Sequence, residues 1–219
     1  MKLSIVMTKI HKWLALIVGL QLLLWVLGGL VMSWFPIENV RGEHNIREDE
    51  SLIITVEDNL LSIADFLESI GPVSRIELKP LLGKPTYQVL TTEGSTLLFD
   101  ANTGESLSPL PEELSLQIAS ADFAGEAGAL STTMLEQGNS EYRGPLPVWQ
   151  VVMNDAEDTR LYVSPSTGDV IARRNATWRL YDFFWMLHIM DYKNRTDFNN
   201  PLVIFASILA LVATISGIW

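Results

Sequence analysis

The chain of 219 residues contains no cysteine and only three histidines. Without cysteine, no disulfide can hold its segments together and no thiolate chemistry is available. The sequence also lacks a G-x-S-x-G element, an H-E-x-x-H element, a Gly-rich phosphate loop and a dinucleotide fingerprint. We therefore predict no catalytic residues and no metal site, and composition leaves open whether the chain is an enzyme.

Acidic residues are absent from both ends of the chain, 1–34 and 201–219. The middle segment carries all 26 acidic residues and only 12 of the 15 basic ones. Each end contains an apolar run long enough to cross a hydrocarbon core of about 30 Å at about 1.5 Å per residue. We predict transmembrane helices in 1–35 and 201–219, the first an uncleaved anchor because it is too long for a signal peptide.

The few charges near the first run set the expected orientation. Lys2, Lys9 and Lys12 are the only charged residues before it, so the positive-inside bias predicts a cytoplasmic N-terminus. Residues 36–200 would then lie in the periplasm, outside a bacterial inner membrane. Their acidity excludes nucleic acid as a partner. The second apolar run extends to Trp219 without a basic residue after it, so the sequence leaves open a continuation of the chain.

The acidic middle segment contains an internal repeat. The stretch YQVLTTEGSTLLFDANTGESL (87–107) matches WQVVMNDAEDTRLYVSPSTGDVI (149–171) in its aromatic-Gln-Val start and its Thr-Gly-acid end. Period-2 alternation and β-branched residues predict strands, and the Thr-Gly elements predict tight turns in which glycine supplies a positive φ. The predicted strands are 86–92, 95–100, 148–154 and 159–164, with turns at 102–104 and 166–168.

A helix is expected before each predicted hairpin. Apolar residues recur at helical spacing in 56–71 and in 111–125. Segment 73–79 predicts an additional strand, and the Gly- and Ala-rich segment 124–146 predicts a loop with one short helix at most. The repeated unit is therefore a helix followed by antiparallel strands, which indicates an α+β fold.

These elements together resemble PepSY-domain membrane proteins with PepSY-associated transmembrane helices. The resemblance is carried by the two copies ending FDANTGE and VSPSTGD, by HKWLALIVGLQLLLWVLGGLVM, and by FFWMLHIMDY followed by PLVIFASILALVATISGIW. It implies a transmembrane helix in 1–35, PepSY-like units in 50–110 and 111–175, an interfacial aromatic helix and linker in 176–200, and a second transmembrane helix in 201–219. Some relatives reduce siderophore-bound iron and carry haem on membrane histidines, and others use PepSY units to bind partners or inhibit peptidases.

Each of the three histidines is a candidate cofactor ligand. The resemblance implies haem b as the cofactor and His11 or His188 as axial ligands, whereas each ring also suits an ordinary membrane interface. His44 lies among acidic residues at a spacing that matches no metal motif. On a helix, five rings would form one stripe that could line a cofactor edge, or simply an aromatic belt. They are Trp178, Tyr181, Trp185, His188 and Tyr192.

Topology limits how these histidines can combine. If the helix over 178–192 lies on the membrane surface, His11 and His188 differ in level by roughly 30 Å and cannot share one iron. His188 would then pair with His44 or with another subunit. Gln21 in the first run and small residues every four positions in the second favour helix packing or a homo-oligomer, although small residues are also ordinary in membrane helices.

Two functions follow from these observations. The first is a membrane-anchored, extracytoplasmic binding or accessory module of an envelope complex, in contact with the lipid bilayer and a membrane-protein partner. The second is a haem b-binding electron-transfer component of ferric-siderophore reduction.

Overall fold

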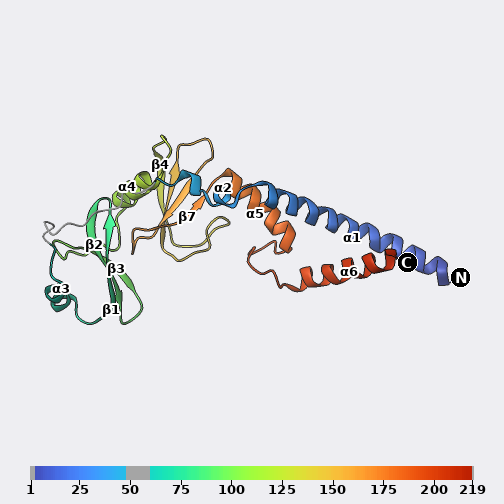
Figure 1. Cartoon of the computed structure of the whole chain (residues 1–219), viewed down its shortest axis with the longest axis horizontal. Coiled ribbons are helices and arrows are strands. Elements are labelled where there is room, and N and C mark those ends of the chain that lie inside the picture. Colours follow the sequence, from blue (N-terminus) through green and yellow to red (C-terminus); the bar gives the residue numbers. More distant parts are fainter. Residues whose placement is uncertain (1–2, 48–59, 219) are drawn as a thin grey trace. The chain divides into compact units, whose positions relative to one another are not determined.

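A computed structural model describes residues 3–47 and 60–218 of the chain (Figure 1). The chain divides into two compact units: residues 1–40 with 177–219, and residues 41–176. Residues 56–59, the first four of the predicted helix 56–71, lie outside the described residues.

The first unit is helical. Its elements are α1 (Leu3–Trp34), most of α5 (Ala176–Ile189) and α6 (Pro201–Ile218), with the short α2 (Ile37–Arg41) at the junction between the units. Within α1, the part His11–Trp34 is long and apolar enough to cross a membrane, as predicted for this end of the chain. In the described part of the chain no other helix meets that length. The apolar part of α6, Pro201–Ile215, is shorter, so a second span stays a prediction.

Helix α6 packs along α1 (Figure 1). Val18 of α1 and Ala210 of α6 are both buried and line the same cavity between the two helices. A small side chain at Ala210 lets the helix backbones approach closely, which is the role of small residues where no hydrophobic effect drives helices together.

The second unit contains two antiparallel sheets, with strand orders β1-β2-β3 and β4-β5-β6-β7 (Figure 1). Helix α3 packs on the first sheet through Phe66, and α4 packs on the second. The elements are η1 (Glu43–Asn45), α3 (Ile63–Ile70), β1 (Val73–Leu81), β2 (Lys84–Thr91), β3 (Thr96–Asp100), α4 (Glu112–Asp122), β4 (Ala129–Leu135), β5 (Val148–Met153), β6 (Arg160–Val163) and β7 (Val170–Arg174).

The predicted strands and the helix in 111–125 are confirmed, whereas two features differ. The prediction of a loop over 124–146 is wrong for its first part, because Ala129–Leu135 forms β4 by pairing with β5. Segment 170–174 forms β7, which the repeat did not predict. At both places the segment pairs with a neighbouring strand, β4 with β5 and β7 with β6, and neither segment shows a clear period-2 alternation of apolar and polar residues. Helix α3 begins later than predicted, where Ser62 accepts the Asp65 backbone N–H at 3.1 Å.

The first two strands of each sheet pair in the same register. The matching pairs are Ile76↔Val89 with Thr132↔Val151, and Leu78↔Tyr87 with Met134↔Trp149. Each sheet also has a bulge near the start of its first strand, at Val73/Arg75 and at Ala129/Ser131. Because both strand pairs have this register, the residues of β1 and β4 hold equivalent positions on the outer edges of their sheets.

Within residues 41–176 the first sheet and α3 have an apolar core of their own, and the first sheet also contributes to the core of the second. Leu98 of β3 is buried in the same cluster as Val151 and Val163 of the second sheet. Ser108 links the sheets in addition, because its Oγ accepts the Leu98 backbone N–H and donates to the Ser166 carbonyl, both at 2.8 Å. The two sheets are thereby held as a single folded body.

The turn at Gly168 shows how closely this core is packed. Gly168 has a φ of 73°, as the Thr-Gly element predicts, and a Cβ there would lie 2.7 Å from Leu81 Cδ1. Gly94 has a φ of 86°, but a Cβ at that position would meet no other atom within 4 Å.

We expect Gly168→Ala to destabilise the chain more than Gly94→Ala. Both changes force a residue into the left-handed region, at about 1–2 kcal/mol. Only Gly168→Ala also overpacks the core, which adds about 1–3 kcal/mol. Thermal unfolding of the detergent-solubilised full chain measures the difference, and equal melting temperatures for the two variants would contradict it.

Candidate functional site

His188 lies against the apolar helix α1. Its ring centroid is 6.4 Å from that of Trp25, and a Cβ added to Gly28 would lie 3.5 Å from Nδ1. His188 therefore lies directly over Gly28, where a Cβ would make an ordinary van der Waals contact with the imidazole. Nδ1 is buried and forms no hydrogen bond.

His188 lies beside a residue well inside the apolar part of α1, and the interfacial location expected for the helix over 178–192 stays a prediction. Trp25 lies nine residues before the end of α1, which is about 13 Å along its axis. Acidic residues had suggested that the helix stays at the interface. Asp182 is buried in an ion pair with Arg195, and the Asp191 carboxylate accepts backbone N–H groups of the loop that follows. With both charges engaged, α5 can meet α1 where Phe184 and His188 lie against Gly28 and Trp25.

The loop over 190–200 is organised by the Asp191 carboxylate. It accepts backbone N–H groups from Asn194 (3.0 Å), Asp197 (3.1 Å), Thr196 (3.0 Å) and Lys193 (3.2 Å). These bonds, the one from Asn194 first, hold the pKa of Asp191 well below its usual range. Since the folded state favours the ionised form, its stabilising effect is complete above the ordinary carboxyl pKa and is lost as the pH falls through the lowered value.

Asn200 joins the end of α5 to the start of α6. Its Nδ2 donates to the Ile189 carbonyl at 2.9 Å, and its Oδ1 accepts the backbone N–H groups of Leu202 and Val203 at 3.1 and 3.0 Å. This is an N-cap, which satisfies amides that the first turn of a helix leaves unpaired. Trp185 Nε1 adds a bond to the Arg195 carbonyl at 3.1 Å. The break between α5 and α6 is therefore an ordered element.

Two cavities lie between these helices. One, of about 350 Å³, is lined by His188, Trp25, Ile189, Phe198, Val203 and Ser207. The other, of about 310 Å³, is lined by apolar residues of α1 and α6 together with Gln21 and Met190. Both volumes are within the range of small-molecule sites.

Three polar atoms in this region are buried without a hydrogen bond: Gln21 Nε2, Trp25 Nε1 and His188 Nδ1. Gln21 and Trp25 are four residues apart on α1 and so lie on one face of the helix. An unpaired buried polar group costs about 1–3 kcal/mol, so each of these atoms is destabilising unless it finds a partner.

The other two histidines are not part of this site. His11 is exposed and lies 14 residues before Trp25, about 21 Å along α1. His44 lies in the second unit, where its Nε2 is 3.6 Å from Glu157 Oε2. Within the described ranges 3–47 and 60–218, no group of three or more His, Asp or Glu side chains could hold a metal ion.

A haem group fits these residues only in part. Neutral imidazole is an ordinary axial ligand, and His188 faces a cavity. A ligating histidine normally donates its second ring N–H to an acceptor, whereas Nδ1 of His188 has none. With His11 about 21 Å away along the helix, the described residues of this unit do not supply a pair of axial histidines.

The predicted aromatic stripe is divided among different contacts. Trp185 packs on Phe198 of the loop, with ring centroids 6.0 Å apart. Tyr192 lies beyond the end of α5, after Met190 at a φ of 55°, and is 51% exposed. Because the helix ends at Ile189, the five residues do not line one continuous edge.

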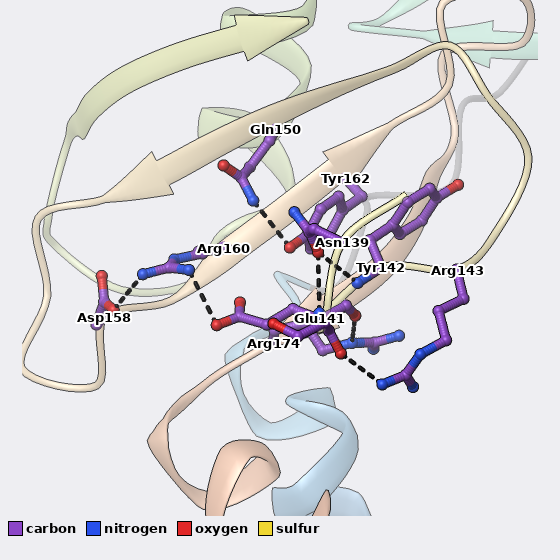
Figure 2. Close-up of polar contacts among 10 residues, drawn as sticks. Asn139, Glu141, Tyr142, Arg143, Gln150, Asp158, Arg160, Tyr162 and Arg174 are labelled. Carbon is purple, nitrogen blue, oxygen red and sulfur yellow. Dashed lines mark hydrogen bonds and ion pairs between the residues drawn. The ribbon is translucent and has the colours of Figure 1, made fainter. Parts of the chain in front are cut away.

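A polar cluster in the second unit covers the outer face of β5 and β6 (Figure 2). The rings of Tyr142 and Tyr162 stack with centroids 4.6 Å apart, and Gln150 Nε2 donates to the Tyr162 hydroxyl at 2.9 Å. Arg160 donates to Glu141 at 2.9 Å, while the Tyr142 hydroxyl donates to the Pro145 carbonyl at 2.8 Å. The cluster fastens the loop 136–147 to the sheet.

The electrostatics of this cluster indicate a structural role. Burial raises the pKa of both Tyr162 and Tyr142 above the usual phenol range, so each ring is neutral at physiological pH. Tyr142 and Tyr162 are 2% and 0% exposed, respectively, which leaves no room for a substrate between them. We therefore assign the cluster to holding the loop rather than to chemistry.

A membrane-crossing apolar helix attached to a unit of two antiparallel sheets defines a membrane-associated α+β protein. The chain belongs to the family of the PepSY-associated TM region, whose model matches residues 8–219. This agrees with the resemblance found in the sequence. No curated protein and no solved structure shows significant similarity to the chain.

Sequence reasoning found His188 and Gln21 but missed Trp25 and Gly28. The spacing of Gln21, Trp25 and Gly28 at i, i+4 and i+7 places them on one helix face and could have identified it. The loop over 190–200 carried no such pattern, because its bonds join side chains to backbone groups a few residues away.

We expect Asp191→Ala to open the loop over 190–200. The change removes the acceptor of four backbone N–H groups, which then lose their partner. Lys193 and Arg195 are trypsin sites within this loop, so limited trypsin digestion should cut the variant several-fold faster than the unmodified chain. Asp197→Ala is the matched control, because its side chain accepts only the Asn199 N–H. Equal cleavage rates for the two variants would refute the role of Asp191.

Proposed function

We propose that the chain is a membrane-anchored binding module that docks a partner polypeptide along the free edge of β4. The N-terminus would lie in the cytoplasm and residues 36–200 in the periplasm of a bacterial inner membrane, in keeping with the positive charge before α1. Residues 50–110 and 111–175 would be two copies of a PepSY-like unit, which their common register supports.

The observation that carries this proposal is the composition of β4. An exposed edge strand offers unpaired backbone groups to other strands, and proteins usually protect such edges with charge or proline. Strand β1 contains Arg75, Glu77, Lys79 and Pro80. Strand β4, ALSTTML, contains neither charge nor proline, and its Leu130 is 68% exposed.

The other edge strands differ from β4 as well. Strand β7 ends in Arg173 and Arg174, and β3 is bridged on its outer side, from Phe99 to Ser106. In the part of the chain that the structure describes, no strand pairs with the outer side of β4. An extended peptide can add to such an edge through main-chain hydrogen bonds.

We expect Thr133→Glu to prevent docking. Thr133 and Glu77 hold equivalent positions, since each pairs with a glutamine of the next strand. A carboxylate at Thr133 would have to lose water when a strand docks, so a photo-crosslinker at Ser131 should give on the order of tenfold less adduct in membranes. The mass of the adduct distinguishes a second copy of the chain from a different protein.

The matched control makes the opposite substitution at the equivalent position of β1. Glu77→Thr makes β1 resemble β4, and it should leave the adduct formed from Ser131 unchanged. Both substitutions are on exposed positions and should alter stability by less than about 0.5 kcal/mol. An undiminished adduct in Thr133→Glu, or an equal adduct from a crosslinker at Arg75, would rule out docking at β4.

The second candidate function is a haem b-binding electron-transfer component of ferric-siderophore reduction. The buried Nδ1 of His188 beside a cavity is the observation that favours it. It ranks second because the described residues bring no second histidine to that cavity.

We expect the detergent-purified chain, expressed with ample haem supply, to show no Soret band. The physical reason is that one histidine without a second axial ligand holds haem weakly. A Soret band that disappears in His188→Ala and persists in His11→Ala would instead establish haem binding at His188.

A further inference from the structure

The free edge of β4 is bordered at both ends by a carboxylate. Glu136 directly follows the last residue of the strand, Glu126 comes three residues before its first, and both are exposed. Among the residues that the structure describes, neither carboxylate forms an ion pair. Two uncompensated negative charges therefore stand at the ends of an uncharged strand.

The charge of the surrounding protein has the same sign. Residues 35–200 carry all 26 acidic residues of the chain and only 12 of the 15 basic ones. Arg160, on β6 of the same sheet, already pairs with Glu141 and Asp158. A strand that docks on β4 would therefore enter a negative field, which favours a partner that brings positive charge.

The two faces of β4 differ in the side chains that they would accept from a docked strand. Thr132 pairs with the buried Val151 and so lies on the core side of the sheet, together with Met134. Ser131 and Thr133 lie on the opposite face and are exposed. Because side chains alternate along a strand, the partner should place apolar residues on the core side and polar residues on the other.

A second copy of the chain does not meet these requirements. In a two-fold symmetric antiparallel pair, the start of one β4 strand would lie at the same end as the finish of the other. Glu126 of one copy would then stand at the same end as Glu136 of the other, and this would occur at both ends of the pair. Like charges at neighbouring positions destabilise strand pairing.

We propose that the partner docked on β4 is a basic-flanked extended polypeptide, an inference that rests on the proposed docking at this edge. Its core matches the seven residues of β4 with alternating apolar and polar side chains, and Lys or Arg follows beyond each end. The core pairs with β4 through main-chain hydrogen bonds, and the basic residues lie beside Glu126 and Glu136. Main-chain bonds supply affinity for any strand, whereas the two charges decide which strand is accepted.

The test measures the fluorescence anisotropy of a labelled probe peptide, KKTVTVTVTKK, with the full chain in detergent. The probe EETVTVTVTEE has the same core and the opposite charges. The basic probe should bind saturably and on the order of tenfold more tightly than the acidic one, and added salt should reduce this difference. A basic probe that is N-methylated throughout its core keeps its charges but cannot donate main-chain hydrogen bonds, so it should lose binding.

Charge reversal on the protein should reverse the preference between the probes. Glu126→Lys combined with Glu136→Lys should make the acidic probe the tighter ligand, and because both positions are exposed the fold should be retained. The matched control is Glu68→Lys combined with Glu105→Lys. It makes the same change in net charge at exposed positions that are not next to β4, and it should still prefer the basic probe.

The outcomes separate this inference from docking itself. Equal affinity for the basic and acidic probes, or a reversed preference in the control variant as well, would overturn the role of Glu126 and Glu136 and leave docking at β4 intact. An adduct from the crosslinker at Ser131 with the mass of two copies of the chain would also overturn the basic partner. If neither probe binds and that crosslinker gives no adduct, docking at β4 is itself wrong.

Discussion

The break between α5 and α6 depends on one carboxylate. Asp191 accepts four backbone N–H groups and turns a strongly polar segment into an ordered loop. Backbone groups near a membrane have to find partners within the protein, because lipid offers none. With Asp191 in this role and Asp182 paired to Arg195, the end of α5 can meet α1, where His188 lies against Trp25. The candidate site therefore depends on charges that are not part of it.

Both units contain buried polar atoms without a hydrogen bond, which in the second unit include Gln88 Oε1, Ser115 Oγ and Arg160 Nε. In the second unit, the cluster around Tyr162 and Tyr142 satisfies its hydroxyl groups within the protein and closes over the sheet. In the first unit, Gln21, Trp25 and His188 each keep a buried atom without a partner. A satisfied network makes a structure rigid, whereas unsatisfied groups in an apolar site are a cost that a bound ligand can remove.

Much of the fold could be predicted from the sequence, because its pattern is local. The apolar run over α1, the helix α4 and the strands β2, β3, β5 and β6 follow from residue spacing, and Gly168 follows from the need for a positive φ. Strands β4 and β7 could not be predicted in this way, since ALSTTML and VIARR lack a clear period-2 alternation and are identified only by their pairing with β5 and β6. Trp25 was likewise unremarkable in sequence until its donor proved to be buried.

The sequence by itself determined the membrane-crossing helix, the two hairpins with their Thr-Gly turns and the small number of histidines. Those features depend on composition and on periodicity along a few residues, so they can be recognised without knowing what lies nearby. Only the tertiary structure decided that His188 of α5 meets Trp25 of α1, that β4 is left as an uncharged edge, and that Gln21, Trp25 and His188 each keep a buried atom without a hydrogen bond. Those features arise from contacts between segments far apart in the chain, where burial and hydrogen bonding are set by neighbours that the local sequence does not specify.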